Sequence, residues 1–259
     1  MESKVSWEPE RYLKYGSLRL RPALDLLMRV RHDSPRRVVD LGCGPGTVTT
    51  VLAERWPDAE IIGVDSSAEM LARAAAAYPR LMWVDADIAH WRTDVPADVI
   101  FSNAALHWLD DHEGLFARLA ANLAPAGALA VQMPANFDAP SHRSIRALAD
   151  GAKWSSCLAG ARMGSVMTAE RYWTLMSSLF HSVELWETIY WQRLQGENAV
   201  LEWLQGTTLV PYLARLDEGQ RAEFLAELGV ELLRAYPVRA EGDVLFPFKR
   251  LFMIGAGVR

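Results

Sequence analysis

The chain has 259 residues, of which 51% are hydrophobic and 23% are charged, a composition ordinary for a globular protein. This length suits one sizeable α/β core with an appended subdomain, and it is short for two independent domains. The formal net charge is −5 and no tract of basic residues occurs, which argues against a nucleic-acid partner.

Cysteine usage and hydropathy bear on the compartment. Cys43 and Cys157 are the only cysteines, so we expect no disulfide framework, and a reducing compartment fits. Residues 1–7 lack the apolar core of a signal peptide, and no run approaches the roughly 18 apolar residues that a membrane span needs. We therefore expect a cytoplasmic protein with no membrane partner.

The first 30 residues contain aromatic and basic side chains ahead of a predicted helix. The helix is expected over residues 22–30, with Pro22 in its first turn. The first predicted strand is preceded by Trp7, Tyr12, Arg19 and Arg21. These four residues either form a lid across the mouth of a ligand site or pack on the sheet.

A strand, a glycine loop and a helix follow in close succession. Val38, Val39 and Leu41 indicate a short buried strand. The loop then carries glycine at alternate positions, Gly42, Gly44 and Gly46, around Cys43. Glycine lets the backbone turn sharply and approach a ligand closely. The helix predicted over residues 47–56 offers unpaired N–H groups to a ligand that carries oxygen acceptors.

Two acids suggest which ligand the loop holds. Asp65 ends the next predicted strand, where an acid is placed to accept hydrogen bonds from the two hydroxyls of a ribose. The dinucleotide fingerprint requires a third small residue where this chain has Thr47. Asp40 before the loop instead suits a ligand with an amino-acid tail, because it can help hold an α-ammonium while loop amides meet a carboxylate. The pattern predicts S-adenosylmethionine as cofactor.

The next helix and strand supply predicted contacts to the adenine ring. A helix is expected over residues 66–77, with Ser66 or Ser67 as its cap and Met70 one turn in, as an apolar face for adenine. The third strand, over residues 81–88, ends in Asp87, placed to bind the adenine amino group, and Ile88, placed to sandwich the ring. A metal site at Asp85 and Asp87 is disfavoured, because hard cations need several converging oxygen ligands.

The fourth predicted strand, beginning at Asp98, runs into a loop containing Asn103, Ala104, His107 and Trp108. Carboxyl ends of parallel strands share one edge, so we expect this loop beside the glycine loop and His107 as a contact to cofactor or substrate. A helix over residues 115–123 and a strand over residues 127–133 follow. The alternation predicts an α/β fold with a doubly wound, mostly parallel, Rossmann-like sheet.

The regular alternation of predicted strands and helices ends near residue 135. We expect helical segments over residues 141–180, a sixth strand over 183–191, helices over 199–204, 208–213 and 218–236, and a seventh strand in the last half of 244–255. The block at 197–242 is an insertion between two strands and is expected to form a cap that sets specificity. The predicted organisation is one domain: lid at 1–30, cofactor-binding core at 31–134, a helical and strand segment at 135–196, the cap, and the last strand at 243–259.

The motifs together resemble a known family. The chain resembles the seven-stranded S-adenosylmethionine-dependent methyltransferases in four motifs: Asp40 to Gly46, Gly63 to Asp65 with Met70, Asp85 to Ile88, and Ser102 with Asn103. Narrower signs point to the group within that family that acts on trans-aconitate: Trp7-x-Pro-x-x-Tyr12-Leu, Arg21-Pro-Ala, Asn103-Ala-x-Leu-x-Trp108-Leu, Val131-Gln-Met-Pro134, Trp203 and Arg250-Leu-Phe. The chain departs from the group at His107, where a member carries an amide, and at Val210, where a basic residue precedes the proline.

The resemblance implies transfer of a methyl group to one carboxylate of trans-aconitate, which gives a monomethyl ester. A carboxylate is ionised at neutral pH, so no side chain is expected to act as a general acid or base. A tricarboxylate needs cations to orient it, and arginine pairs well with carboxylates. The expected substrate-binding residues are Trp7, Tyr12, Arg19, Arg21, His107, Trp203, Tyr212 and Arg250.

Three alternative functions stay open at this stage. In the first, the methyl acceptor is another small carboxylic acid, and in the second it is a malonyl thioester. In the third, the chain binds the cofactor without catalysis, as a sensor or regulatory subunit. A dehydrogenase is disfavoured by the glycine spacing. The sequence predicts no oligomeric state.

Overall fold

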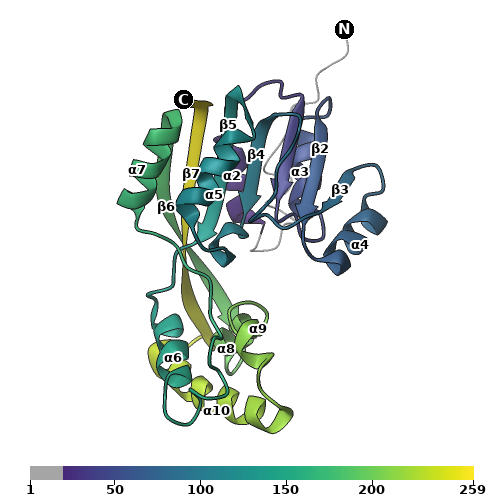
Figure 1. Ribbon diagram of the computed structural model, residues 1–259. Coiled ribbons are helices and arrows are strands. Elements are labelled where there is room, and N and C mark those ends of the chain that lie inside the picture. The colour runs from purple at the N-terminus through teal and green to yellow at the C-terminus, as the bar shows by residue number, and fades with distance from the viewer. Residues whose placement is uncertain (1–19) are drawn as a thin grey trace. The chain divides into compact units, whose positions relative to one another are not determined.

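The computed structural model describes residues 20–259, so the predicted roles of Trp7, Tyr12 and Arg19 lie outside the described residues. The core element is a seven-stranded sheet with the strand order β3-β2-β1-β4-β5-β7-β6 (Figure 1). The strands are β1 (Arg37–Leu41), β2 (Glu60–Asp65), β3 (Met82–Asp85), β4 (Ala97–Asn103), β5 (Leu123–Pro134), β6 (Phe180–Gln195) and β7 (Asp243–Val258). The predicted seven-stranded α/β sheet is confirmed.

The helices follow the expected order, with shifted ends. They are α2 (Arg21–Leu27), α3 (Thr47–Arg55), α4 (Ala68–Ala77), α5 (His112–Ala121), α6 (Pro140–Ala149), α7 (Ala169–Leu179), α8 (Ala199–Gln205), α9 (Val210–Leu213) and α10 (Glu218–Ala235), with a 3₁₀ turn at Leu106–Trp108. Helix α5 begins earlier than predicted because the Asp111 side chain caps it by accepting the Gly114 N–H.

Two expectations for the second half of the chain were wrong in extent. Residues 150–168, expected to be helical, form turns and irregular chain between α6 and α7. Strands β6 and β7 are also much longer than the alternating sequence predicted. The two strands are sheet neighbours, and each therefore supplies the other's backbone hydrogen bonds beyond the apolar stretches.

The chain forms two compact units. Within the described residues, the first unit comprises 20–133, 167–187 and 251–259, and the second comprises Pro134–Val166 and Thr188–Arg250. Strands β6 and β7 are shared between the units, because each crosses a unit boundary. The helical insertion between β6 and β7 belongs to the second unit together with α6.

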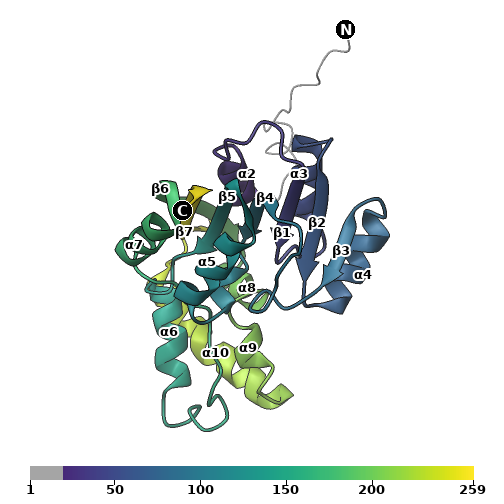
Figure 2. The same ribbon diagram turned by 45° about the horizontal axis from the view of Figure 1, so that its top comes forward.

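The first unit contains the parallel part of the sheet. Strand β1 pairs in parallel with β2 and β4, β2 pairs with β3, and β4 pairs with β5. The chain moves outward from β1 to β3 and then returns to the other side of β1 at β4, as Figure 2 shows. Right-handed crossovers place α3 and α4 on one face and α5 on the other, so β1 and β4 form a topological switch point, where such sheets bind ligands.

The second unit has its own hydrophobic core beneath α6, α8, α9 and α10. Helix α10 lies against α6 (Figure 2) and begins with a capping box in which Asp217 and Gln220 bond each other's backbone N–H groups. Phe224 on α10 is fully buried and packs edge-on against Trp154 with a centroid distance of 5.3 Å. The Trp154 indole N–H donates to Glu227 at 2.9 Å, which orients the ring.

Within residues 20–259, every helix is too short or too polar to cross a lipid bilayer.

The core of the second unit should depend strongly on Phe224. We expect Phe224→Ala to lower the free energy of unfolding by about 3 to 5 kcal/mol, because truncation loses the buried ring and leaves a cavity. Val230→Ala on the same helix, at a half-exposed position, should change it by less than about 0.5 kcal/mol. Urea titration followed by circular dichroism measures both, and equal effects would contradict this account of the core.

Candidate functional site

The glycine loop after β1 is held against the end of β2. The N–H groups of Gly42 and Cys43 both donate to the Val64 carbonyl, at 2.8 and 3.1 Å. Gly42, Gly44 and Gly46 have φ values of 75°, 54° and 83°, which L side chains rarely adopt. A Cβ on Gly42 would lie 2.2 Å from the Cβ of Ala105, whereas a Cβ on Gly44 would meet nothing within 4 Å. Gly42 is therefore needed for packing, and Gly44 faces open space, as a ligand cradle requires.

Trp83 of β3 fills the space beneath this loop. A Cβ on Gly46 would lie 2.5 Å from the Trp83 ring, and one on Gly63 would lie 2.4 Å from it. The ring N–H donates to the Tyr78 carbonyl at 3.2 Å, which fixes its orientation. Trp83 belongs to none of the motifs that the sequence displays, although the glycines that it contacts leave room for a large ring.

Asp65 links three elements at the edge of the sheet. One carboxylate oxygen accepts the Gly44 N–H at 2.9 Å, and the other accepts the Ser67 N–H at 2.9 Å. Ser67 rather than Ser66 caps α4, since its side chain accepts the Met70 N–H. Each carboxylate oxygen keeps a second lone pair, so Asp65 can also accept hydrogen bonds from a ligand.

Asp40 is buried beneath the loop. Its carboxyl group is 1% exposed and accepts a hydrogen bond from the Thr49 hydroxyl at 2.7 Å. Burial raises the pKa of Asp40 from 3.8 to about 7, with a smaller contribution from the negative charge of Asp65, while the Thr49 bond opposes the shift. Burial also raises the pKa of the Cys43 thiol, so Cys43 is a small packing residue and stays protonated. Its role and that of Asp40 in holding a ligand stay predictions.

Strand register aligns polar side chains along one row at the carboxyl edge. Asp40 pairs with Gly63 and with Phe101, and Phe101 pairs with Ala130. Residues two positions further along each strand share the same face. That next row contains two pairs of polar side chains, Asp65 with Asp85 and Asn103 with Gln132. Gly42, the first residue after β1, follows the strand that lies between the two pairs. We call the four polar side chains and Gly42 the edge row.

The predicted adenine contacts lie next to the β2 and β3 side of the edge row. A Cβ on Gly42 would lie 3.4 Å from the Ile88 Cδ1, so Ile88 is close to the loop. Asp87 is exposed, and one of its oxygens accepts the Ala89 N–H at 2.9 Å. Met70 is half-buried at the start of α4, and Ser66 is exposed. Contact of these four residues with a ligand stays a prediction.

The loop after β4 approaches the glycine loop, as the sequence predicted. Ala104 has φ of 56°, unusual for a residue with a side chain, and its N–H donates to the Gln132 carbonyl at 2.9 Å. The Asn103 Oδ1 is buried and, among the described residues, has no hydrogen-bond partner. His107 is buried beside the exposed Trp108, with a ring-centroid distance of 4.8 Å. His107 and Trp108 therefore reach this edge, but their contacts with a ligand stay predictions.

The remaining predicted substrate ligands divide between the units. Arg21 is exposed at the start of α2 in the first unit. In the second unit, Arg250 stacks on Phe248 at 4.2 Å, and Trp203 meets the same ring at 6.2 Å. Tyr212 is 3% exposed within the core of the second unit, where burial raises its pKa. That position gives Tyr212 a packing role whether or not its hydroxyl reaches a ligand.

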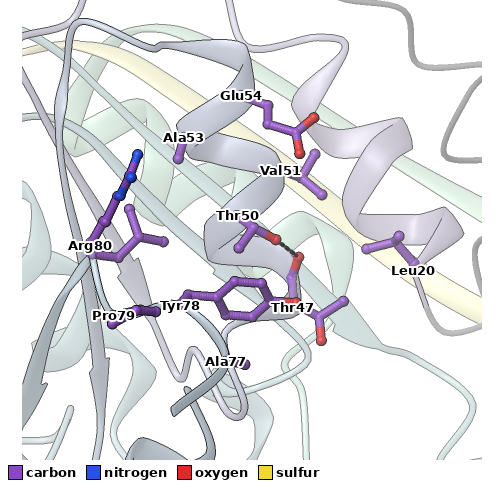
Figure 3. Close-up of a pocket in the computed structure, with 11 residues that line it drawn as sticks. Leu20, Thr47, Thr50, Val51, Ala53, Glu54, Ala77, Tyr78, Pro79 and Arg80 are labelled. Atoms are coloured by element: carbon purple, nitrogen blue, oxygen red, sulfur yellow. Dashed lines mark hydrogen bonds between the residues drawn. The ribbon is translucent and has the colours of Figure 1, made fainter. Parts of the chain in front are cut away.

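A separate hollow of about 780 Å³ lies along α3 (Figure 3). Thr47, Thr50 and Glu54 line it from the helix, and Tyr78, Pro79 and Arg80 line it from the segment after α4. Of the predicted cofactor- and substrate-binding residues that lie within residues 20–259, none lines this hollow. In the described part of the chain, no group of three or more His, Cys, Asp or Glu side chains is arranged to hold a metal ion.

Comparison with known proteins decides the family. A family model described as a methyltransferase domain matches residues 38–127. The chain is 45% identical over 250 residues to a trans-aconitate 2-methyltransferase of Azoarcus sp. (strain BH72), covering 96% of this chain and 98% of the relative. A relative of the same name from Yersinia pestis (strain Pestoides F) is 41% identical, covering 98% and 99%. The chain belongs to the trans-aconitate 2-methyltransferase family.

Solved structures support the fold of this family member. The YcgJ protein from Bacillus subtilis is similar with a TM-score of 0.60 and 15% identity, covering 91% of this chain and 97% of that one. A putative methyltransferase from Bacillus halodurans gives 0.59 at 12% identity, covering 91% and 98%. Phosphoethanolamine N-methyltransferase 2 from Haemonchus contortus gives 0.55 at 16% identity, covering 90% of this chain and 52% of that one.

The burial of Asp40 predicts a specific dependence of stability on pH. Its folded-state pKa lies above that of the unfolded chain, so its contribution to stability is full below about pH 4 and is lost as the pH rises through about 7. We expect wild-type stability to lose about 3 kcal/mol through this group between about pH 5 and about pH 8.5. Asp40→Asn should remove that loss and keep the Thr49 bond.

Urea unfolding at both pH values measures the difference. The exposed Asp94→Asn variant is the control and should retain the wild-type pH dependence. An unchanged pH dependence in Asp40→Asn would contradict the burial argument.

Proposed function

We propose that this chain transfers the methyl group of S-adenosylmethionine to one carboxylate of trans-aconitate, forming a monomethyl ester and S-adenosylhomocysteine. The observation that carries the proposal is 45% identity over almost the full length of a relative named for that reaction. The glycine loop and edge row supply independent support, because they have the features that a nucleoside with an amino-acid tail requires.

The residues at the switch point fit this cofactor. Gly44 leaves open space beside a loop of backbone N–H groups, and Asp65 retains lone pairs for the ribose hydroxyls. At the other side of the loop, the Asn103 Oδ1 is buried and has no hydrogen-bond partner in the described part of the chain, so it is an acceptor suited to an ammonium group. Ile88, close to Gly42, offers an apolar surface to the adenine ring.

The cofactor supplies an electrophilic methyl group when it is bound. The acceptor carboxylate is already ionised at neutral pH, so the protein needs no general base. Its residues contribute by excluding water and by orienting the acceptor, which can lower a barrier by several kcal/mol. His107 therefore serves as a contact in this scheme and needs no change of protonation.

Cationic side chains orient the acceptor in this proposal. Arg250, buried and stacked on Phe248, has a guanidinium whose position is fixed by packing, which favours it over a mobile surface arginine. The other proposed contacts are Arg19, Arg21 and the aromatic residues Trp7, Tyr12, Trp203 and Tyr212.

We further propose that the protein acts in the cytoplasm, because the free cysteines Cys43 and Cys157 suit a reducing compartment.

A direct assay tests the function. Purified protein is incubated with S-adenosylmethionine labelled in the methyl group and with a panel of carboxylic acids that includes trans-aconitate, other di- and tricarboxylates and a malonyl thioester. We expect base-labile label in trans-aconitate above all others. Label only in another acid would replace the acceptor, and cofactor binding without any methylation would favour a regulatory protein.

Asp65 should dominate cofactor affinity. We expect Asp65→Asn to raise the Kd for S-adenosylhomocysteine by about 10- to 100-fold, because an amide loses the charge and can accept at only one of two positions. Isothermal titration calorimetry measures the affinity. Asp85→Asn, at the exposed in-register neighbour, is the matched control and should change the Kd by less than about threefold. Similar losses in both variants would argue against a specific role for Asp65.

A further inference from the structure

We propose that Gln132 is a specificity-determining residue that binds a carboxylate of the acceptor through its side-chain amide. This inference rests on the proposed function and deepens it, since it adds an uncharged ligand to the arginines proposed above. Gln132 stands at the carboxyl end of β5, in an otherwise apolar run that ends at Pro134. Its position, burial and chemistry each support the assignment.

Gln132 is a buried polar side chain that has no hydrogen-bond partner in residues 20–259. The residue is 0% exposed, and neither its Nε2 nor its Oε1 has a hydrogen-bond partner among the described residues. Leaving such groups unsatisfied costs about as much as a lost hydrogen bond, so they call for a physical explanation. A ligand that accepts from Nε2 would remove this cost at the moment of binding.

The edge row places Gln132 on the ligand side of the sheet. Gln132 pairs in register with Asn103, so the two side chains stand on one face. The Gln132 carbonyl accepts the Ala104 N–H, and the chain that follows packs Ala105 against Gly42 of the glycine loop. Gln132 is thus joined through one short loop to the proposed cofactor cradle.

The order of strands separates Gln132 from the nucleoside end of the cradle. Asp65, the proposed ribose acid, lies on β2, and β1 and β4 intervene before β5. Three strand spacings amount to roughly 14 Å. Asn103, one strand nearer, is the better candidate for the amino-acid tail of the cofactor. Gln132 lies beyond it, where an acceptor belongs.

An amide suits this position chemically. A carboxylate that is to act as a nucleophile must be oriented and desolvated while it retains its electron density. The neutral amide N–H donates a directional hydrogen bond without adding the full positive charge of an arginine. The remaining carboxylates of the acceptor can then pair with arginine.

The test is Gln132→Met, which keeps the length and approximate volume of the side chain and removes both polar atoms. We expect the melting temperature to stay the same or rise, because an unsatisfied buried amide is removed. The Kd for S-adenosylhomocysteine should stay within about threefold of wild type, while kcat/KM for trans-aconitate should fall by about 10- to 100-fold. Gln195→Met, the same change at an exposed position on β6, should leave all three quantities unaltered.

A second readout is independent of turnover. In protein labelled with ¹⁵N in the glutamine side chains and saturated with S-adenosylhomocysteine, the amide signal missing from Gln132→Met should shift when trans-aconitate is added. A stationary signal under saturating trans-aconitate would overturn the proposal, as would wild-type kcat/KM in Gln132→Met. A large loss of S-adenosylhomocysteine affinity would instead make Gln132 a cofactor ligand and also overturn it.

These outcomes separate the two proposals. If wild-type protein methylates trans-aconitate and Gln132→Met does so equally well, only the role of Gln132 falls. If wild-type protein does not methylate trans-aconitate, the proposed function fails and the assignment of Gln132 fails with it.

Discussion

The carboxylate of Asp65 ties together the end of β2, the glycine loop and the start of α4. It accepts backbone N–H groups from Gly44 and Ser67, each at 2.9 Å. These two bonds fix the loop at a place where glycine conformations with positive φ would otherwise leave it many alternatives. Each of the two oxygens keeps a second lone pair, which can accept a further hydrogen bond. A single side chain thus sets the shape of the loop and carries the acceptors that we propose for the ribose hydroxyls.

Asp40, two residues before Gly42, is buried, whereas Asp65 is partly exposed. Asp40 is held by Thr49, and its pKa is raised to about 7 by desolvation. A carboxyl group in that state weakens the fold as it ionises. An ionised Asp40 would be stabilised by a nearby cation, and an ammonium group is one that the proposed cofactor brings. Binding and the protonation of Asp40 are therefore expected to be coupled.

Family membership and site chemistry answer different questions. Identity of 45% over nearly the whole chain establishes the family, and the solved structures, at 12 to 16% identity, establish only the fold. In the proposed function, side chains outside the shared cofactor motifs select the acceptor. We place among them the buried Gln132 amide, which has no hydrogen-bond partner in residues 20–259, and Arg250, which stacks on Phe248.

The sequence by itself determined the local features: the glycine loop, the acid after β2, the strand and helix order, and the inserted helices between two neighbouring strands. These depend on interactions within short stretches, such as backbone freedom at glycine, capping and hydrophobic periodicity. The sequence wrongly predicted helix for residues 150–168 and predicted β6 and β7 to be shorter than they are. The conformation of irregular chain and the extent of strand pairing are set by neighbours that are distant in the sequence.

Only the tertiary structure decided which side chains share the carboxyl edge. Register between β4 and β5 brings Gln132 beside Asn103. The sequence marked this glutamine only as part of a family motif, whereas the structure shows that its side chain is buried and that its donor and acceptor have no partner in residues 20–259. Packing likewise revealed that Trp83 fills the space beside Gly46 and Gly63, and that Thr49 satisfies Asp40. Such relations join residues far apart in the chain or on adjoining elements. They depend on three-dimensional packing and solvent exclusion, which no local pattern of residues encodes.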